Sequence, residues 1–248
     1  MYLRERLKLL PPGNFVEVGS GRGYVSKVLL ELGWTGVSYD LNPSALEEAK
    51  KVNEDAVREG RFAVVCGDWL KSESNGKVDL IISCFVLEHL DDEAENNYFA
   101  KCSGELKGGG KLVLMVPANP DSWTIEDEVA GHYRRYTRGR LNGLAAKHNF
   151  ESRHLAGLNF PLTNMLQPIG NILIKAHQLD SESKDMSLLE RTKLSGNRKV
   201  PFLTAFPAAL GVILNPITLA PFHWLQKANR DNPSCLVLYF EATNQASA

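Results

Sequence analysis

The sequence predicts an α/β fold, in which helices cover a mostly parallel sheet and a helical insertion lies near the carboxyl end. Three observations lead to this prediction. Short apolar stretches alternate with stretches of helical period between residues 13 and 155, as is typical of parallel sheets. Glycine-rich turns separate them, and the densest places glycine at positions 19, 21 and 23. A last stretch rich in β-branched and aromatic residues follows much later, from Ser234 to Ala242.

The densest glycine turn joins the first predicted strand to a helix. Phe15, Val16 and Val18 form a short apolar run that suits a strand buried on both faces. Apolar residues at helical spacing mark the helix, namely Val25, Val28, Leu29 and Leu32. Because glycine has no β-carbon and a helix N-terminus offers N–H groups, a ligand can approach this backbone closely. The pattern therefore indicates a nucleotide-binding corner.

The other elements follow in order along the chain. Further strands are predicted at Val37 to Tyr39, Phe62 to Cys66, Val78 to Ser83, Lys111 to Val116 and Phe150 to Leu155. A short amphipathic helix precedes Pro11, and a longer one is predicted from Ala45 to Val57, after Asn42 as its cap. Asp91 and Thr137 are the predicted caps of two later helices.

The composition of the chain indicates which binding partners and which cellular compartment to expect. The 28 Lys and Arg residues nearly balance the 29 Asp and Glu residues, giving a net charge of −1 and no overall field for holding nucleic acid. We therefore expect no nucleic-acid partner. The four cysteines show no metal-binding spacing and indicate free thiols in a reducing compartment. The charged N-terminus is unlike a secretory signal, so a cytoplasmic location is expected.

Spacing within the glycine turn separates two classes of ligand. Dinucleotide oxidoreductases carry G-x-G-x-x-G, whereas this turn reads G-x-G-x-G. Glu17 precedes the glycines and suits a cationic amino group better than a pyrophosphate. The run EVGSGRG resembles the first motif of class I S-adenosylmethionine-dependent methyltransferases, and the order of elements extends the resemblance from about residue 13 to 155. A nicotinamide-dependent oxidoreductase and a non-catalytic S-adenosylmethionine-binding protein remain the alternatives.

The resemblance implies a Rossmann-like, doubly wound sheet with an antiparallel last strand, and S-adenosyl-L-methionine as cofactor. Asp40 follows Gly19 by 21 residues, which suits a carboxylate that accepts hydrogen bonds from a ribose diol, although it could also cap the next helix. Asp68 could accept the adenine amine, and Trp69 could stack on the base or pack in the core. The predicted cofactor-binding residues are Glu17, Gly19, Ser20, Gly21, Gly23, Tyr24, Asp40, Leu41, Asp68, Trp69 and Cys84.

Glu88 and His89 raise the question of a metal. Some methyltransferases bind a divalent metal through E-x-x-E-H at this place, but Phe85 occupies the first position here and cannot coordinate a cation. We therefore predict no metal. His132 is the first candidate for a catalytic base and His89 the second, because an oxygen acceptor must lose its proton.

The segment around His132 reads GHYRRYT and resembles a branch of these methyltransferases associated with bacterial glycan and glycolipid pathways. In that setting Tyr133 would donate a hydrogen bond beside the transferred methyl. Four arginines follow within this region and suit either an anionic acceptor or ion pairs with the acidic loop before them: Arg134, Arg135, Arg138 and Arg140. The expected acceptor is a small molecule, a glycan or a lipid-linked intermediate.

Residues 157–233 form the predicted insertion, so residues 1–156 and 234–248 make up the S-adenosylmethionine-binding domain. Residues 201–225 contain no charged residue, and their length alone would suit a membrane span. Four prolines would break such a span, so short helices that cap the substrate cleft are the first interpretation. A peripheral contact with the inner face of the membrane is the second.

Overall fold

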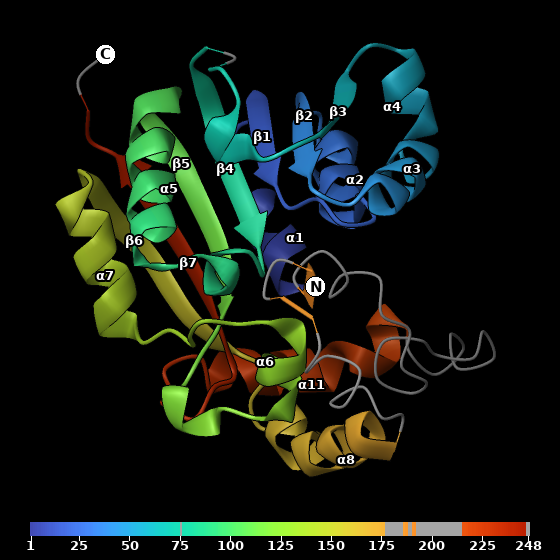
Figure 1. Ribbon diagram of the computed structural model, residues 1–248, viewed down its shortest axis with the longest axis vertical. Helices are drawn as coiled ribbons and strands as arrows, with labels where there is room; N and C mark the ends of the chain where they lie inside the picture. The colour runs from blue at the N-terminus through green and yellow to red at the C-terminus, as the bar shows by residue number, and fades with distance from the viewer. Residues whose placement is uncertain (75, 177–185, 188–189, 192–214, 247–248) are drawn as a thin grey trace.

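The computed structural model describes residues 1–74, 76–176, 186–187, 190–191 and 215–246. Seven strands form one sheet in the order β3-β2-β1-β4-β5-β7-β6 (Figure 1). Their bounds are β1 Asn14–Val18, β2 Thr35–Asp40, β3 Phe62–Cys66, β4 Val78–Cys84, β5 Leu106–Pro117, β6 Phe150–Leu158 and β7 Val237–Asn244. The first five strands pair in parallel, whereas β7 pairs antiparallel with both β5 and β6. The predicted fold class is confirmed, including the antiparallel last strand.

Helices cover both faces of this sheet. Their bounds are α1 Tyr2–Leu7, α2 Tyr24–Glu31, α3 Pro43–Val52, α4 Glu54–Arg58, α5 Asp92–Glu105, α6 Ile125–Ala130, α7 Arg138–Lys147, α8 Leu162–Ala176 and α11 Pro216–Ala228. Three short 3-10 turns complete the described elements: η1 Trp69–Lys71, η2 Leu87–His89 and η3 Pro120–Ser122. Figure 1 shows α6, α8 and α11 gathered at the lower end of the sheet, beyond the arrowhead of β4.

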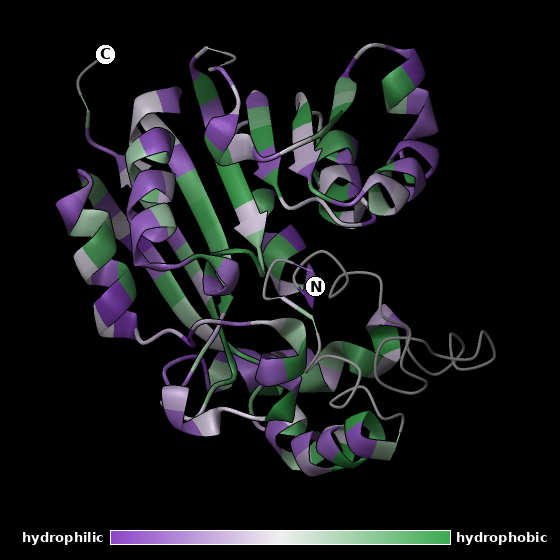
Figure 2. Cartoon of the chain, viewed as in Figure 1, coloured by the Kyte–Doolittle hydropathy of each residue, from purple (hydrophilic) through white to green (hydrophobic). Residues whose placement is uncertain are grey.

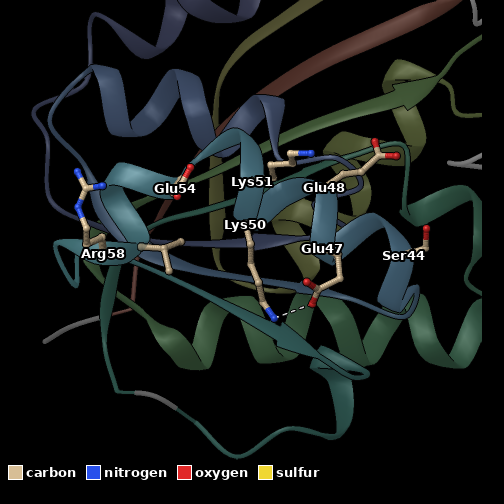
Figure 3. A pocket seen from close by; sticks show the side chains of 8 residues that line it. Ser44, Glu47, Glu48, Lys50, Lys51, Glu54 and Arg58 are labelled. Atoms are coloured by element: carbon tan, nitrogen blue, oxygen red, sulfur yellow. Dashed lines mark hydrogen bonds and ion pairs between the residues drawn. The ribbon is translucent and has the colours of Figure 1, made fainter.

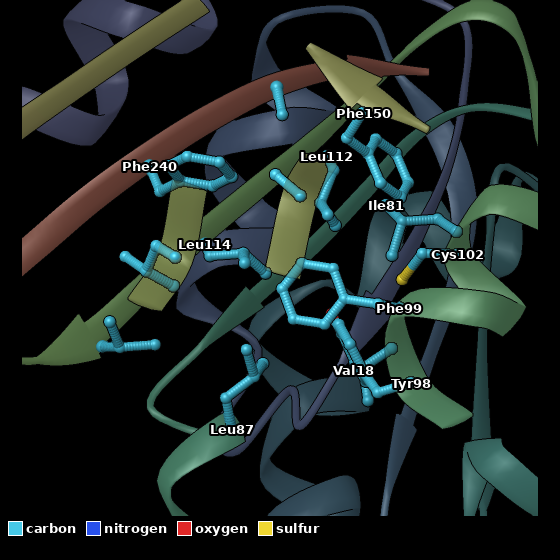
Figure 4. Close-up of a cluster of buried hydrophobic side chains, with 14 of the residues drawn as sticks. Val18, Ile81, Leu87, Tyr98, Phe99, Cys102, Leu112, Leu114, Phe150 and Phe240 are labelled. Carbon is cyan, nitrogen blue, oxygen red and sulfur yellow. The ribbon is translucent and has the colours of Figure 1, made fainter. Parts of the chain in front are cut away.

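Two apolar clusters lie on opposite faces of the sheet. One contains Tyr98 and Phe99 of α5, Leu141 of α7 and the side chains of the strands beneath them (Figure 4). The other joins α1, α2 and α4 to the alternate residues of the same strands, such as Leu80 and Ile82 of β4. The central strands are therefore hydrophobic on both faces, which is why they appear in the sequence as continuous apolar runs. Figure 2 shows these runs as green stretches along the strands.

The predicted helix caps lie where the sequence placed them. The side chain of Asn42 accepts hydrogen bonds from the backbone of Ser44 and Ala45, that of Asp91 from Ala94, and that of Thr137 from Arg140. Each side chain thereby satisfies N–H groups that have no partner inside the helix.

One helix differs from its prediction. The stretch predicted as a single helix from Ala45 to Val57 is broken at Asn53 into α3 and α4. Asn53 is buried, and its Nδ2 donates to the carbonyl oxygens of Gly23 and Ala49 at 3.0 and 2.9 Å. This tertiary contact with the glycine turn is not encoded in helical periodicity, so the sequence pattern missed the break.

The described part of the insertion consists mainly of α8 and α11. Pro168 lies inside α8, which begins at Leu162. Asn215 caps α11, and His223 and Lys227 of that helix contact Glu5 of α1 at 2.7 and 2.9 Å. Residues 201–214 of the proposed cap lie outside the described residues. Within the described ranges, no helix has the length and apolar character needed to cross a membrane.

Candidate active site

A cavity of about 700 Å³ opens at the carboxyl ends of four neighbouring strands. Val18 ends β1, Asp40 ends β2, Gly67 follows β3 and Cys84 ends β4, and all four residues line it. The strand order reverses between β1 and β4, and open α/β sheets bind ligands at such a point. The cavity also contains many of the residues predicted from sequence: Gly19, Gly21, Asp40, Leu41, Asp68, Trp69, Cys84, His89, His132 and Tyr133.

Two glycines of the turn have different reasons for lacking a side chain. Gly21 has a φ of +49°, and a β-carbon placed there would meet no heavy atom within 4 Å, so its backbone faces open space at the cavity. At Gly23, with a φ of +77°, a β-carbon would lie 2.7 Å from Nδ2 of Asn53 and 2.8 Å from the β-carbon of Ala49. Gly21 therefore leaves room for a ligand, whereas Gly23 lets the turn pack against α3.

Asp40 links the glycine turn to the end of β2. Its Oδ2 accepts a hydrogen bond from the backbone N–H of Gly21, and its Oδ1 accepts one from Asn42, both at 2.8 Å. The carboxylate is half-buried and lines the cavity. The cap of the next helix is Asn42 and not Asp40, so the helix-capping interpretation of Asp40 is wrong. Its place in the cavity wall fits the predicted contact with a ribose.

Asp68 and Trp69 form the wall beyond β3. Oδ1 of Asp68 accepts from the backbone of Leu70 at 3.0 Å and so begins the turn η1. Trp69 is 2% exposed, and its ring meets Tyr98 edge to face at a centroid distance of 5.4 Å. Trp69 therefore packs in the core while also lining the cavity, and the two interpretations of this residue are compatible.

Four residues predicted to bind the cofactor do not line the cavity: Glu17, Ser20, Gly23 and Tyr24. Glu17 lies behind the wall, fully buried, and accepts a short hydrogen bond from the hydroxyl of Ser26 in α2. Burial, and to a smaller extent the charge of Asp40, raises the pKa of Glu17 to about 8. Tyr24 is largely exposed at the start of α2.

The opposite end of the cavity is formed by Glu88, His89, His132 and Tyr133. The rings of His89 and His132 meet edge to face with centroids 4.8 Å apart. Nε2 of His132 lies 4.0 Å from Oε1 of Glu88, and the backbone N–H of Tyr133 donates to the carbonyl of Glu88 at 2.7 Å. The structure thus brings together η2 and the GHYRRYT segment, which are more than 40 residues apart in sequence.

Burial is the main cause of the pKa shifts at this end of the cavity. Glu88 is fully buried, and desolvation, followed by the charge of Asp127, raises its pKa to about 8, although Arg135 and its own backbone amide oppose the shift. Desolvation and the neighbouring His132 lower the pKa of His89 to about 4, so this ring is neutral at pH 7. Burial also raises the pKa of the Cys84 thiol, which keeps it protonated.

Asp127 of α6 holds His132 in place. Its Oδ1 lies 2.8 Å from Nδ1 of His132, and its carboxylate also accepts from Arg135 and from the backbone of Thr124. Burial alone would raise the pKa of Asp127, but these hydrogen bonds reverse the effect and lower it. An ionised carboxylate can only accept, so Nδ1 of His132 carries the hydrogen and the Nε2 lone pair of the neutral ring points away from Asp127.

The four arginines after His132 contact the protein itself. Arg134 and Arg140 pair with Asp92 and Glu95 of α5. Arg135 pairs with Asp127, and Arg138 donates to the carbonyls of Leu155 and Arg230. The ion-pair interpretation is therefore favoured over an anion site, but most partners come from α5 and not from the preceding acidic loop.

Glu88 and Tyr98 are the cavity residues that sequence reasoning missed or undervalued. The sequence pattern singles out Glu88 only as part of a metal motif, and it does not single out Tyr98. A carboxylate inside the apolar run CFVLEHL was the available signal, because an isolated acidic residue is seldom buried without a purpose. Glu126 and Ala130 of α6 also line the cavity, and only the fold brings them there.

A second hollow, of about 940 Å³, lies over α3 and α4 (Figure 3). All the side chains that line it are exposed, and most are charged: Ser44, Glu47, Glu48, Lys50, Lys51, Glu54, Val57 and Arg58. Lys50 pairs with Glu47 at 2.8 Å within one helix turn. With no buried polar group facing it, this hollow has the character of a solvated helix surface, and the cavity at the strand ends is the candidate site.

Comparisons with known proteins agree with this geometry. A family model described as a methyltransferase domain matches residues 2–155. An uncharacterized methyltransferase from Bacillus cytotoxicus is 36% identical over 102 residues, which cover 41% of this chain and 46% of that protein. Another from Bacillus cereus is 34% identical over 120 residues, which cover 48% of this chain and 54% of that protein. The chain thus spans about half the length of the curated relatives it matches.

Solved structures share the fold. The 1,6-didemethyltoxoflavin-N1-methyltransferase of Burkholderia thailandensis, solved with S-adenosylhomocysteine bound, gives a TM-score of 0.53 at 20% identity and covers 64% of this chain and 71% of that one. TehB from Haemophilus influenzae gives a TM-score of 0.51 at 17% identity, over 64% and 52% of the two chains. The family model matches well over half of this chain, and the chain therefore belongs to that family of methyltransferase domains.

Proposed function

We propose that this protein transfers a methyl group from S-adenosylmethionine to a small-molecule acceptor, a class in which we include glycan and lipid-linked intermediates. The observation that carries the proposal is the cavity itself. It joins the glycine turn, Asp40 and Asp68 at one end to Glu88, His89 and His132 at the other. Family membership and a structural neighbour with bound S-adenosylhomocysteine support the choice of cofactor.

The residues at the strand ends fit this cofactor. The open space at Gly21 allows close approach to the backbone, and the Asp40 carboxylate lies beside it. Asp68 and the buried face of Trp69 supply an acceptor and an apolar wall for a base. S-adenosylmethionine supplies an activated methyl on a sulfonium, so the protein's part is mainly to position the acceptor and to exclude water.

We assign removal of the acceptor's proton to the other end of the cavity. We propose His132 as the first candidate base and His89 as the second, with Tyr133 as a hydrogen-bond donor to the acceptor. Asp127 supports this role, because it fixes the hydrogen of His132 on Nδ1 and leaves Nε2 to accept a proton. Only 13% of the His132 side chain is exposed, so the proton would pass in a largely dry site.

The first test is cofactor binding by calorimetry, with NADH as the competing candidate. We expect S-adenosylmethionine to bind and Asp40→Ala to weaken its binding roughly ten- to a hundredfold, because a hydrogen bond to a charged group contributes about 1.5–3 kcal/mol. Asp40→Asn is the matched control, since it keeps one acceptor oxygen. Tight NADH binding, or unchanged S-adenosylmethionine affinity in folded Asp40→Ala, would contradict the assignment. Labelled S-adenosylmethionine and a panel of acceptors then identify the substrate.

A further inference from the structure

Among the described residues, Glu88, His89 and His132 form a group in which each offers one potential metal-ligand atom, and these atoms all lie within 4.8 Å of one another. Two come from the turn η2, and the third comes from the segment after α6. All three line the cavity. Two imidazoles and one carboxylate are a set that divalent transition metals favour, whereas magnesium and calcium prefer oxygen ligands alone.

Glu88 has a buried carboxylate that requires a hydrogen-bond donor or a cation as its partner. Its side chain is completely buried, and in the described part of the chain neither carboxylate oxygen makes a hydrogen bond to a neighbouring residue. Leaving such a group unpaired is costly, so native structures normally satisfy it with a donor or a cation. Nε2 of His132 lies 4.0 Å from Oε1 of Glu88, which is too long for a hydrogen bond but leaves room for an ion between the two atoms.

Both histidines already have the supporting contacts that metal ligands show. Nδ1 of His132 donates to Asp127 at 2.8 Å, and Nδ1 of His89 donates to the carbonyl of Gly131 at 3.4 Å. Because a carboxylate and a carbonyl only accept, each neutral ring carries its hydrogen on Nδ1 and its lone pair on Nε2. A carboxylate or carbonyl that accepts from Nδ1 fixes the orientation of the histidine ring and raises the basicity of Nε2 toward a metal.

We propose that Glu88, His89 and His132 bind one divalent transition-metal ion of the zinc type, facing the acceptor end of the cavity. Three protein ligands leave coordination positions open, as in catalytic zinc sites. The purpose we assign to the ion rests on the proposed function: it would bind an acceptor oxygen and lower its pKa. In the metal-bound protein, Nε2 of His132 is a ligand and cannot accept a proton, so the acceptor hydroxyl with its lowered pKa would release its proton to water instead.

This inference departs from the sequence prediction of no metal. That prediction considered only the position three residues before Glu88, where Phe85 stands. Phe85 lines the cavity but has no ligand atom, so the sequence motif is incomplete at that position. The third ligand comes instead from His132, which lies after a separate helix and can be recognised only in three dimensions.

The experiment is a cobalt titration of the full chain after treatment with a chelator and without S-adenosylmethionine. Cobalt reports its own coordination through visible absorption, so the readout does not depend on activity. We expect one equivalent to bind, zinc to displace it, and Glu88→Gln and His132→Gln each to weaken binding at least about tenfold. His223→Gln is the matched control, because His223 also contacts a glutamate, Glu5 at 2.7 Å, but belongs to a different surface.

Two outcomes would overturn the metal site: a wild-type protein that shows no stoichiometric cobalt band, or a band that persists unchanged in both ligand variants. The wild-type measurement decides this even if a variant fails to fold. Calorimetry with S-adenosylmethionine on the same samples separates this inference from the proposed function. Cofactor binding without cobalt binding would remove the metal and leave His132 as the base, whereas cobalt binding without cofactor binding would contradict the proposed function.

Discussion

At the scale of single residues, the site depends on carboxylates whose burial differs sharply. Asp40 is half-buried at the cavity and accepts from two backbone N–H groups, whereas Glu17 lies behind the wall and accepts a hydrogen bond from the Ser26 hydroxyl. Both stand close to the same glycine turn, and the sequence predicts both as cofactor ligands, Glu17 from the run EVGSGRG and Asp40 from its spacing to Gly19. Their different exposure indicates that Asp40 is available to a ligand and that Glu17 supports the turn from within the core.

The buried position of Glu17 predicts a particular dependence of stability on pH. Its pKa is raised to about 8 in the folded protein, above the value of about 4.3 expected in the unfolded chain. The folded state therefore holds the extra proton, and the stability that this group contributes is fully present below the unfolded pKa and is lost as pH rises toward 8. We expect Glu17→Gln to lose less stability than wild type over that range.

Urea unfolding at about pH 5 and about pH 8.5 measures this difference, with exposed Glu31→Gln as the control. A Glu17→Gln protein that follows the wild-type pH profile would show that Glu17 is ionised in the folded state. The same samples test the predicted cofactor role, because loss of S-adenosylmethionine affinity at constant fold would place the Glu17 carboxylate in contact with the ligand.

At the scale of elements, apolar runs and turn chemistry predicted most of the fold. The strands β1 to β6 contain the runs expected from sequence, and β7 overlaps the predicted stretch Ser234 to Ala242 but begins at Val237. The central strands were the easiest to predict, because a strand buried on both faces is apolar throughout. The errors lie where a tertiary contact overrides a local pattern. Helical period continues through Asn53, yet its amide turns to the carbonyl of Gly23 and the helix breaks there.

The same limit applies to the site. The strand-end residues Asp40 and Asp68 could be predicted, since each follows an apolar run directly in the sequence. The contact between Glu88 and His132 could not, because α5, β5 and α6 separate them along the chain. Local spacing does not specify which residues meet across the mouth of a sheet.

The break at Asn53 gives an element-scale prediction. In Asn53→Ala the carbonyl of Gly23 loses a buried donor, so we expect unfolding free energy to fall by about 1–3 kcal/mol and S-adenosylmethionine to bind more weakly. Asn229→Ala is the matched control: its Nδ2 also donates to the carbonyl four residues earlier, at 2.9 Å, but far from the glycine turn. Equal losses in the two variants, with unchanged cofactor affinity, would contradict a role for Asn53 in supporting the turn.

At the scale of the whole molecule, the region matched by the family model is joined by contacts to the segment between β6 and β7. The family model ends at residue 155, and the sheet is completed only by β7, which returns after the insertion. α11 is joined to the core through Glu5 of α1, and the carbonyl of Arg230 accepts from Gly157 at the end of β6 at 2.6 Å. The part of the insertion that follows Asn215 is therefore bound to the core.

These contacts determine how the role of the insertion in selecting the acceptor can be tested. Residues 177–214 can be replaced by a glycine–serine linker while α8 and α11 stay in place. Because the cofactor end of the cavity is built from β1 to β4 and their turns, we expect the shortened protein to bind S-adenosylmethionine as wild type does. We expect methyl transfer to the native acceptor to fall at least about tenfold, since the replacement removes residues 201–214, which carry no charge and suit an apolar acceptor.

Calorimetry and a labelled-methyl assay, run side by side, give the two readouts of this last prediction. A second variant, in which residues 177–214 are kept in composition but shuffled in order, serves as control. It shows whether methyl transfer requires the natural sequence or only a connection of that length. If the shortened protein keeps its affinity for S-adenosylmethionine and methylates the same acceptor at the wild-type rate, acceptor choice belongs to the end of the cavity formed by Glu88, His89 and His132 alone.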